Sequence, residues 1–397
     1  MRRIADRRRA VLAMAGAVLL AACGTGGAAG AAGSPGTPSP IPSAAASPIS
    51  CAGQVLGRMT EDQRIGQLFS LGLPGNALGP GERAAIRTLH LGSVWFVETS
   101  HAGVGPIRAV ADAVEAQATG SATDGVRLFV AANQEGGQVQ ALNGPGFSSI
   151  PSALEQGGLD PAVLQGDAAA WGRELKAAGV NLNFAPVMDV VPPGTDAQNL
   201  PIGALQRAYG HDARTVGTHG AAFVRGMTQA GVATTVKHFP GLGRVQGNTD
   251  FAAGVVDQTT TPDDPSLASF QQGIVAGAPF VMVALATYTR IDPAHLAVFS
   301  PTVIGLLRGS MGFGGVVVSD DLGAAEAVAA ITPERRAVDF LAAGGDLVVS
   351  KTLDATVRMA GGVQARAATD PAFRAVVDAA ALRVLTAKQA FGLLPCG

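Results

Sequence analysis

The stretch VATTVKHF (residues 232–239) decides the fold, because an apolar run ends there in two polar side chains, Lys237 and His238, and gives way to a glycine-rich loop. Continuous apolar runs bounded by turn residues are typical of strands buried on both faces of a parallel sheet. Seven more such runs recur along the chain: IGQLFSLGL (65–73), GSVWFV (92–97), VRLFVAA (126–132), VNLNFAPV (180–187), PFVMVALA (279–286), GVVVSD (315–320) and DLVVSK (346–351).

The spacing of these runs predicts the fold class. Each pair of neighbouring runs is separated by enough residues to hold a helix. Strands that alternate with helices favour an α/β fold, and eight of them favour a (β/α)8 TIM-type barrel. The 347 residues from Cys51 onward suit one such domain. We therefore expect a single catalytic barrel domain over residues 51–397.

Polar clusters follow several of the predicted strands. They are NQEGGQVQ (133–140), Met188-Asp189, Lys237-His238 and Ser319-Asp320-Asp321. A barrel brings the carboxyl ends of its strands to one rim, where the active sites of such barrels lie. We therefore expect these clusters to meet in one pocket.

Two carboxylates facing one pocket would support glycoside hydrolysis, in which one attacks the sugar and the other handles the leaving-group proton. Asp320, at the end of the very apolar strand GVVVS, is the candidate nucleophile. The alternative for Asp320 and Asp321 is a helix cap followed by a first-turn acid. Lys237 and His238 end a buried strand and need polar partners there, so they are candidates for binding sugar hydroxyls. The alternative for His238 is a structural histidine.

Composition and motifs argue against several other classes. The six histidines show no metal-binding spacing such as HExxH, and the chain has no GxSxG elbow and no phosphate loop. The formal net charge is −2 and no basic patch is present. We expect no cofactor, no metal and no nucleic-acid partner, but a carbohydrate substrate.

The domain resembles glycoside hydrolase family 3, in particular its single-domain bacterial β-N-acetylhexosaminidases of the NagZ type. The matching stretches are NQEGGQVQ, GVNLNFAPVMDV (179–190), RAYG (207–210), GVATTVKHFPG (231–241) and GFGGVVVSDDLG (312–323). The resemblance implies a (β/α)8 barrel, a retaining double displacement and no cofactor. Carried over by position, it makes Asp320 the nucleophile and assigns Arg207, Lys237 and His238 to substrate binding, with Asn133 at the place of a family aspartate.

The chain departs from the family pattern in the loop after KHFPG. The family has HGD and then a DSH triplet whose histidine is the acid/base, whereas this chain has LGR (242–244) and Asn248-Thr249-Asp250. A family arginine is replaced by Ala141 and a family histidine by Leu285. We expect Asp250 to serve as the proton donor in place of the histidine, because carboxylic acids fill that role in most glycosidases. The alternative is that Asp250 caps a turn.

The N-terminus predicts export. Residues 1–22 combine an arginine-rich start with an apolar run of thirteen residues, as in a signal peptide, and LAAC (20–23) resembles a lipobox. We expect lipidation of Cys23, a flexible linker over residues 23–50 rich in Gly, Ala, Ser and Pro, and a position on the outer face of the cytoplasmic membrane or in a periplasm-like space. An ordinary signal peptide is the alternative. With Cys23 lipidated, we expect Cys51 and Cys396, near the two ends of the domain, to form a disulfide in an oxidising compartment. Two free thiols are the alternative.

Three functions fit these observations. The first is a retaining exo-β-N-acetylglucosaminidase that releases terminal N-acetylglucosamine from cell-wall muropeptides or related glycans. The second keeps the mechanism but takes glucose or xylose, since several polar contacts of the family are absent. The third is a sugar-binding lipoprotein that has lost catalysis, although the intact SDDLG around Asp320 argues against it.

Overall fold

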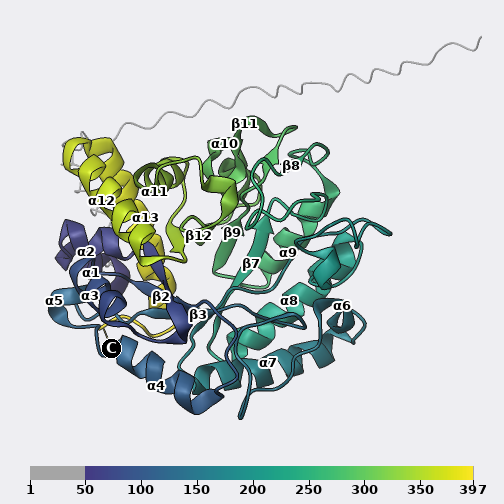
Figure 1. The fold of residues 1–397 in the computed structure, drawn as a ribbon, viewed down its shortest axis with the longest axis horizontal. Coiled ribbons are helices and arrows are strands. Elements are labelled where there is room, and N and C mark those ends of the chain that lie inside the picture. The colour runs from purple at the N-terminus through teal and green to yellow at the C-terminus, as the bar shows by residue number, and fades with distance from the viewer. Residues whose placement is uncertain (1–49, 397) are drawn as a thin grey trace, which may run out of the picture. The chain divides into compact units, whose positions relative to one another are not determined.

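The computed structural model describes residues 50–396, and its centre is a closed barrel of eight parallel strands (Figure 1). In barrel order the strands are β1 (Phe69–Leu73), β13 (Leu347–Ser350), β12 (Val316–Asp321), β9 (Phe280–Val283), β7 (Ala233–Phe239), β6 (Leu182–Asn183), β3 (Phe129–Ala132) and β2 (Ser93–Phe96). Each strand comes from one of the eight predicted apolar runs, so the (β/α)8 prediction is confirmed.

Burial on both faces explains why these runs form strands. The residues of β1, β2, β3, β7, β9 and β13 are all buried. The barrel strand β6 has only two residues, but irregular backbone pairing with β7 continues beyond it. The amide of Met188 donates to the carbonyl of Lys237 at 2.6 Å. This pairing places the segment after β6 next to the end of β7.

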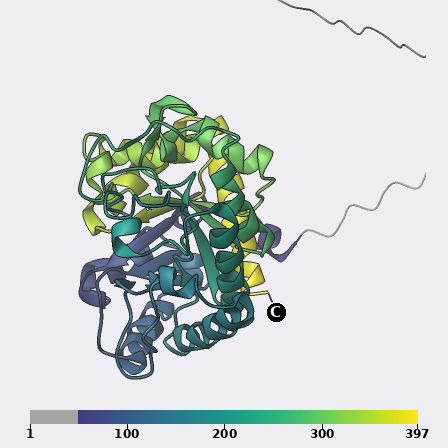
Figure 2. The ribbon, with the colours of Figure 1, turned by 90° about the vertical axis from the view of Figure 1, so that its right-hand side faces the viewer.

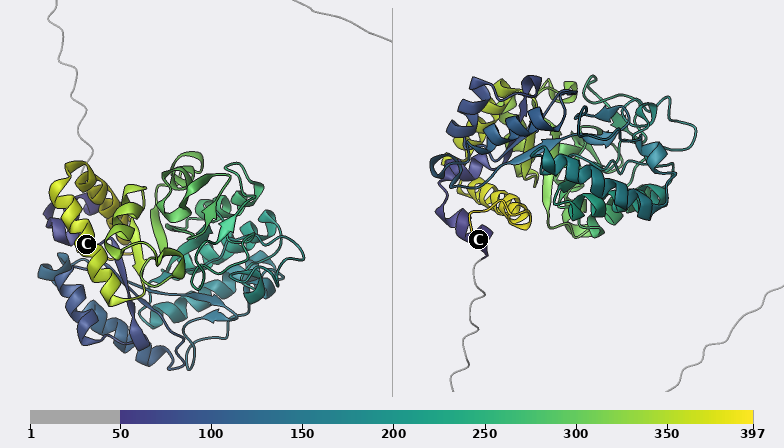
Figure 3. Two further views of the ribbon diagram at one scale, coloured as in Figure 1. Left: turned by 45° about the horizontal axis from the view of Figure 1, so that its top comes forward. Right: turned by 90° about the horizontal axis from the view of Figure 1, so that it is seen from below.

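Helices surround the barrel, as Figures 2 and 3 show from other sides. The helices alternate with the barrel strands along the chain. In chain order they are α3 (Pro80–Thr88), α4 (Val104–Glu115), α5 (Gly120–Thr123), α6 (Ala153–Gln156), α7 (Pro161–Ala177), α8 (Ala213–Gln229), α9 (Ala268–Val275), α10 (Pro301–Gly305), α11 (Pro333–Ala342) and α12 (Leu353–Thr369). Several start where the sequence supplies a cap. Asp160 accepts a hydrogen bond from the amide of Ala162 at the start of α7, and Asp212 does so from Thr215 in α8.

Two small sheets lie outside the barrel. A hairpin pairs β4 (Gln134–Gly136) with β5 (Val139–Gln140), and a three-stranded sheet joins β8 (Val256–Asp257), β10 (Thr287–Tyr288) and β11 (Asp292–Leu296). All five strands belong to segments that follow β3, β7 or β9 in the chain. These loops are therefore ordered structures that shape the rim of the barrel.

The helices α1 (Cys51–Arg58), α2 (Glu61–Gly66) and α13 (Pro371–Ala390) lie beside one another (Figure 1). Lys388 of α13 is fully buried, and its amine donates to Gln67 Oε1 at 2.7 Å and to the carbonyls of Gly92 and Arg127 at 2.8 Å. Gln67 lies two residues before β1 and Gly92 lies directly before β2, so α13 is fixed to the amino-terminal ends of these strands. Burial lowers the pKa of Lys388 to about 7.

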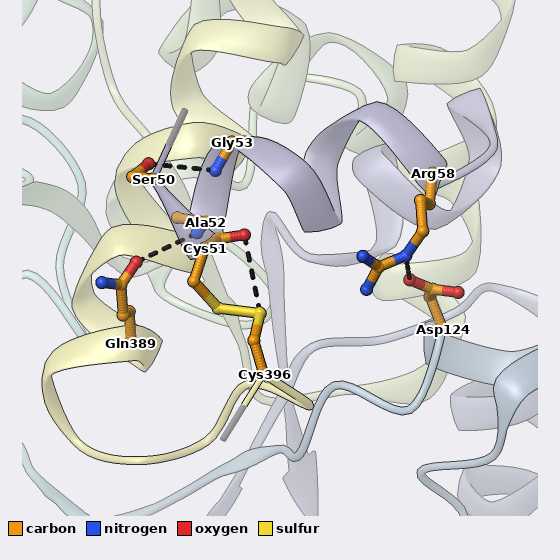
Figure 4. Close-up of a disulfide and its surroundings, with 8 residues drawn as sticks. All are labelled: Ser50, Cys51, Ala52, Gly53, Arg58, Asp124, Gln389 and Cys396. Carbon is orange, nitrogen blue, oxygen red and sulfur yellow. Dashed lines mark hydrogen bonds and ion pairs between the residues drawn. A yellow bond between two sulfur atoms is a disulfide. The ribbon is translucent and has the colours of Figure 1, made fainter. Parts of the chain in front are cut away.

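A disulfide joins Cys51 to Cys396, as Figure 4 shows, with the Cα atoms 6.2 Å apart. The neighbouring amide of Ala52 donates to Gln389 Oε1 at 3.0 Å, and the amide of Gly53 donates to Ser50 Oγ at 3.2 Å. The predicted bond is thus present, and it ties the start of α1 to the segment after α13.

Removing this bond with Cys51→Ser and Cys396→Ser is expected to destabilise the domain. By chain entropy, closing a loop of 345 residues stabilises the folded state by at most about 5 to 6 kcal/mol, and measured values usually fall short of this limit. Urea unfolding of the oxidised protein and of the double variant measures the difference. Equal free energies of unfolding would contradict the expectation.

Within residues 50–396, no helix has both the length and the apolar character needed to cross a membrane. The predicted signal peptide, the lipidated Cys23 and almost all of the linker fall on residues 1–49, which lie outside the described residues.

Candidate active site

A cavity of about 570 Å³ lies at the carboxyl ends of the barrel strands. Its walls come from the ends of β2, β3, β7, β9, β12 and β13 and from the loops that follow β6 and β7. All six residues that the sequence assigned to catalysis or substrate binding line it: Asn133, Arg207, Lys237, His238, Asp250 and Asp320. The barrel has therefore brought together side chains that lie up to 187 positions apart in the sequence.

A buried carboxylate, Glu135, organises one wall of the cavity. Arg207 donates two hydrogen bonds to it, from Nε at 2.8 Å and from a terminal nitrogen at 2.7 Å. Lys237 Nζ lies 2.6 Å from Glu135 Oε1 and donates to Asn133 Oδ1 at 2.8 Å. Burial alone would raise the pKa of Glu135, but the positive charges of Arg207 and Lys237 lower it to about 2. The carboxylate therefore stays ionised and orients both cations toward the cavity.

His238 is held in a similar way by a second buried acid. Its Nδ1 lies 2.8 Å from Asp189 Oδ2, while Asp189 Oδ1 accepts hydrogen bonds from the amides of His238 at 3.1 Å and Leu242 at 2.8 Å. Within residues 50–396, the other ring nitrogen, Nε2, has no hydrogen-bond partner. The ring is thus oriented by Asp189, and Nε2 is left for a ligand in the cavity.

Asp320 and Asp321 end β12 but have different surroundings. The amide of Asp321 donates to Asp320 Oδ1 at 2.8 Å, and no side chain among the described residues pairs with the Asp320 carboxylate. Asp321 accepts hydrogen bonds from the amides of Gly323 at 2.7 Å and Lys351 at 2.8 Å. Burial raises the pKa of Asp321 to about 6 despite these bonds. Asp321 therefore links the ends of β12 and β13 through backbone amides. The carboxylate of Asp320, in contrast, is open, which means that no side chain among the described residues pairs with it.

Asp250 reaches the same cavity from the loop after β7. The loop is attached to the segment after β12, because the amide of Glu326 donates to the carbonyl of Asp250 at 3.2 Å and that of Ala327 to the carbonyl of Thr249 at 3.1 Å. Although Asp250 is an exposed residue, partial desolvation in the cavity mouth and the negative charge of Asp320 raise the pKa of its carboxyl. A carboxyl with a raised pKa beside an open carboxylate is the arrangement that glycoside hydrolysis requires.

The floor of the cavity includes apolar side chains. Trp95 and Phe184 meet edge to face with ring centroids 6.2 Å apart, and Trp95 Nε1 donates to the carbonyl of Ser350 at 3.3 Å. Met282 also contributes to the lining. Such surfaces exclude water and pack against the apolar faces of sugar rings.

Replacing Glu135 with Ala is expected to destabilise the fold by about 3 to 5 kcal/mol, because two buried cations would lose their shared partner. The pKa of about 2 lies below the ordinary 4.5. The ionised group therefore stabilises the fold above pH 4.5, and this contribution is lost as the pH falls toward 2. Urea unfolding across this range, with the more conservative Glu135→Gln as a second variant, measures both effects.

The control for Glu135 is Glu334→Ala. Glu334 pairs with Arg358 at 2.8 Å, but both side chains are exposed, so its removal should leave the free energy of unfolding almost unchanged. Equal losses of stability in the two variants would contradict a central role for Glu135.

The positions where the sequence departs from the family pattern fall into two groups. Leu242 and Asn248 line the cavity, so their replacement of polar family residues alters the site directly. Ala141 and Leu285 are buried in the apolar core and do not line the cavity. Asn133, at the place of a family aspartate, also lines the cavity, so the polar contacts change both in the loop that carries Asp250 and directly after β3.

The sequence reasoning missed several residues of the cavity, among them Trp95, Phe251 and Lys351. Trp95 and Lys351 lie at or just after the ends of predicted strands, so the rule that pointed to Lys237 and Asp320 also applies to them. For Phe251, the only feature of the sequence that could have indicated a place in the cavity is its position next to Asp250.

A second cavity, of about 610 Å³, lies beside residues 243–246 of the same loop. Its acid, Asp264, is paired with Arg244 at 2.6 Å. It therefore lacks the open pair of carboxyls found in the first cavity. Within residues 50–396 no group of three or more His, Cys, Asp or Glu side chains is arranged to hold a metal ion.

The chain is similar to several known proteins. The family model described as the glycosyl hydrolase family 3 N terminal domain matches residues 60–387. The chain is 38% identical over 233 residues to a beta-hexosaminidase of Stenotrophomonas maltophilia (strain K279a). This match covers 56% of this chain and 66% of that protein. The match thus spans just under two thirds of the length of that relative.

Two solved structures extend the likeness. A crystal structure of a beta-N-acetylhexosaminidase from Beutenbergia cavernae DSM 12333 is 51% identical, with a TM-score of 0.82 over 83% of this chain and 99% of that chain. A family 3 beta-N-acetylglucosaminidase from Paenibacillus sp. str. FPU-7 is 29% identical, with a TM-score of 0.75 over 84% of this chain and 63% of that chain.

Proposed function

Because the chain belongs to glycosyl hydrolase family 3, we propose that it is a retaining exo-β-N-acetylglucosaminidase that releases terminal N-acetylglucosamine from cell-wall muropeptides or related glycans. One observation carries the proposal: the open carboxylate of Asp320 and the carboxyl of Asp250, whose pKa is raised, line one cavity. The names of the relatives at 38% and 51% identity support the choice of sugar.

In the first step Asp320 attacks the anomeric carbon as the bond to the leaving group breaks. Asp250 gives its proton to the departing glycosidic oxygen, so the leaving group departs as a neutral alcohol. The sugar is then bound to Asp320 as an ester. In the second step the ionised Asp250 removes a proton from water, the water oxygen attacks the same carbon, and Asp320 is released as a carboxylate.

The remaining polar residues would bind the sugar. Glu135 fixes the orientations of Lys237 and Arg207 and offsets one of their two positive charges. Such preorganised donors bind hydroxyls without the cost of ordering them during the reaction. His238 offers its free Nε2, and Asn133 lies beside the amine of Lys237. Replacement of Lys237 would therefore raise KM as well as lower kcat.

We also propose that the protein is exported and anchored through a lipid on Cys23, with residues 23–50 as a linker to the catalytic domain. The lipobox-like LAAC motif supports this proposal. The disulfide between Cys51 and Cys396 is consistent with an oxidising compartment. Intact mass of the protein from a membrane fraction, compared with a Cys23→Ala variant, tests it.

Turnover of a panel of aryl glycosides by residues 50–397 tests the choice of sugar. We expect p-nitrophenol release from the β-N-acetylglucosaminide to exceed that from the β-glucoside and the β-xyloside by at least about 100-fold, the scale of discrimination that binding one substituent provides. Faster release from the glucoside or the xyloside would contradict the proposed preference for N-acetylglucosamine and identify glucose or xylose as the sugar instead. Binding of N-acetylglucosamine without turnover of any substrate would favour a sugar-binding protein.

A further inference from the structure

Asn199 is a buried side chain next to the loop that carries Asp250, and it has no part in the mechanism above. It is 2% exposed and lines the second cavity, not the first. Its side-chain amide donates to the carbonyl of Leu242 at 2.7 Å and to that of Val245 at 2.6 Å. Its Oδ1 accepts a hydrogen bond from the amide of Gly203 at 2.7 Å. These bonds all go to the backbone, and two of them hold the loop.

The loop between β7 and β8 depends on such outside partners. Residues 240–255, all of which the structure describes, form no helix or strand. Leu242 and Val245 are only 2% and 1% exposed. A buried backbone carbonyl without a hydrogen bond is costly, and Asn199 supplies the partner for both carbonyls. The first part of the loop is therefore fixed to the segment that follows β6.

The segment that carries Asn199 also carries a residue of the sugar-binding wall. Arg207 is bound to Glu135, as described above, and it donates a further hydrogen bond at 2.8 Å to the carbonyl of Pro201. Pro201 lies two positions after Asn199 and lines the first cavity. One short segment thus joins the wall formed by Arg207 to the loop that follows β7.

Only a short stretch of chain separates this attachment from Asp250. Asp250 follows Val245 by five positions. At the far end of the stretch, amides of the segment after β12 hold the carbonyls of Thr249 and Asp250. The conformational freedom of a loop falls as the loop becomes shorter, so attachment at both ends leaves Asp250 few other positions. Loss of the attachment at Val245 would release the amino-terminal side of Asp250.

We propose that Asn199 is a positioning residue, which fixes the loop after β7 so that the carboxyl of Asp250 meets the glycosidic oxygen. The inference rests on the proposed function, because that function makes Asp250 the proton donor. A donor must lie within hydrogen-bond reach of the oxygen that it protonates, and a displacement of about 1 Å can lower a rate by about 10²-fold. Asn199 does not line the first cavity, so it acts through the loop and not on the sugar.

The test uses two substrates that differ in their need for a proton. Asn199→Ala should lower kcat/KM for the disaccharide N-acetylglucosaminyl-β-1,4-N-acetylglucosamine by about 10²-fold. The dinitrophenyl β-N-acetylglucosaminide loses its leaving group as an anion, so its value should change by less than about three-fold. In an Asp250→Asn protein, Asn199→Ala should lower the disaccharide rate no further, because both changes then affect the same step. A further loss there would contradict the inference.

Asn181→Ala is the matched control. Asn181 is 5% exposed and also joins backbone groups, since it donates to the carbonyl of Leu128 at 3.0 Å and accepts from the amide of Val130 at 2.8 Å. It lies directly before β6 and does not line the first cavity. A loss of activity through lower stability should appear in both variants. A change in the ratio of the two substrates should appear only in Asn199→Ala.

A second variant and a second measurement keep the test decisive if Asn199→Ala folds poorly. Asn199→Asp keeps the size of the side chain and the acceptor for Gly203 but has at most one donor for the two loop carbonyls, so it should also lower the ratio. Hydrogen exchange measured by mass spectrometry reports the order of the loop without any turnover. The amides of residues 242–250 should exchange faster in Asn199→Ala than in the unchanged protein, but not in Asn181→Ala.

The outcomes separate this inference from the proposed function. The proposed function fails if the unchanged protein cleaves no N-acetylglucosaminide, and hydrogen exchange of residues 242–250 then decides whether Asn199 holds the loop. Unchanged exchange in Asn199→Ala would overturn the inference. Equal losses for the disaccharide and the dinitrophenyl glycoside would also overturn it, even if the unchanged protein cleaves both.

Discussion

Asp320→Ala is expected to lower kcat on an aryl N-acetylglucosaminide by about 10⁴-fold or more, since loss of a nucleophile removes the covalent route altogether. The fold should persist, because Asp320 ends β12 at the rim of the barrel and is only partly buried. Its carboxylate accepts a hydrogen bond from the amide of Asp321 and from no side chain among residues 50–396. Steady-state kinetics and the urea midpoint, measured together, separate catalysis from stability.

The matched control for Asp320 is Asp354→Ala. Asp354 is an exposed aspartate in the first turn of α12 and does not line the cavity. Its removal should leave kcat within about two-fold of the unchanged protein. Activity of Asp320→Ala above a few per cent of that of the control would contradict the assignment of the nucleophile.

Asp250→Asn is expected to have an effect that depends on the leaving group. Disaccharides need protonation of the departing oxygen, so their cleavage should fall by about 10²- to 10⁴-fold, the usual contribution of general acid catalysis. Aryl glycosides with acidic phenols lose their leaving groups as anions, so their first step should change much less. The asparagine keeps the size of the side chain but cannot donate an acidic proton.

The pH profile gives a second test of Asp250. A proton donor must be protonated when the cycle begins, so activity should fall as the pH rises through its pKa. Partial desolvation and the charge of Asp320 raise that pKa above its ordinary value of 3.8. This alkaline limb should disappear in Asp250→Asn. If it persists there and disappears in Asp321→Asn, the group with a pKa of about 6 at Asp321 is the donor instead.

Azide distinguishes a proton donor from a residue that only shapes the loop. Azide attacks the glycosyl enzyme without needing a base, so it should partly restore turnover of activated aryl glycosides by Asp250→Asn and yield the glycosyl azide. If Asp250→Asn instead slows good and poor leaving groups equally and azide has no effect, Asp250 is a structural residue of the loop.

The barrel could be predicted from the sequence because its strands are buried on both faces. Such strands read as continuous apolar runs, and Val316, Val317 and Val318 of β12 illustrate this. The position of Asp320 followed from the same reasoning, since parallel strands in a barrel end at one rim. That Lys237, His238 and Asp320 lie in one cavity could be predicted from the order of strands and helices along the chain alone.

The contacts inside the site could not be predicted in this way. Glu135 meets Lys237 and Arg207 across 102 and 72 positions of sequence, and the loop geometry decides which acid neutralises which cation. The role of Asp321 depends on the backbone amides of Gly323 and Lys351, which follow β12 and β13. Phe251 belongs to no periodic pattern, and only the folded loop places its ring at the mouth of the cavity.

The most direct measurement of the central claim is covalent labelling of Asp320. A 5-fluorinated N-acetylglucosaminyl fluoride reacts with a retaining enzyme in the first step, and the fluorine slows release of the sugar. Peptide mass spectrometry should then find one adduct, on Asp320, that is absent from Asp320→Ala and that prevents turnover of the aryl glycoside. A protein that cleaves the aryl glycoside but carries no adduct, or carries it on another carboxylate, would contradict the account.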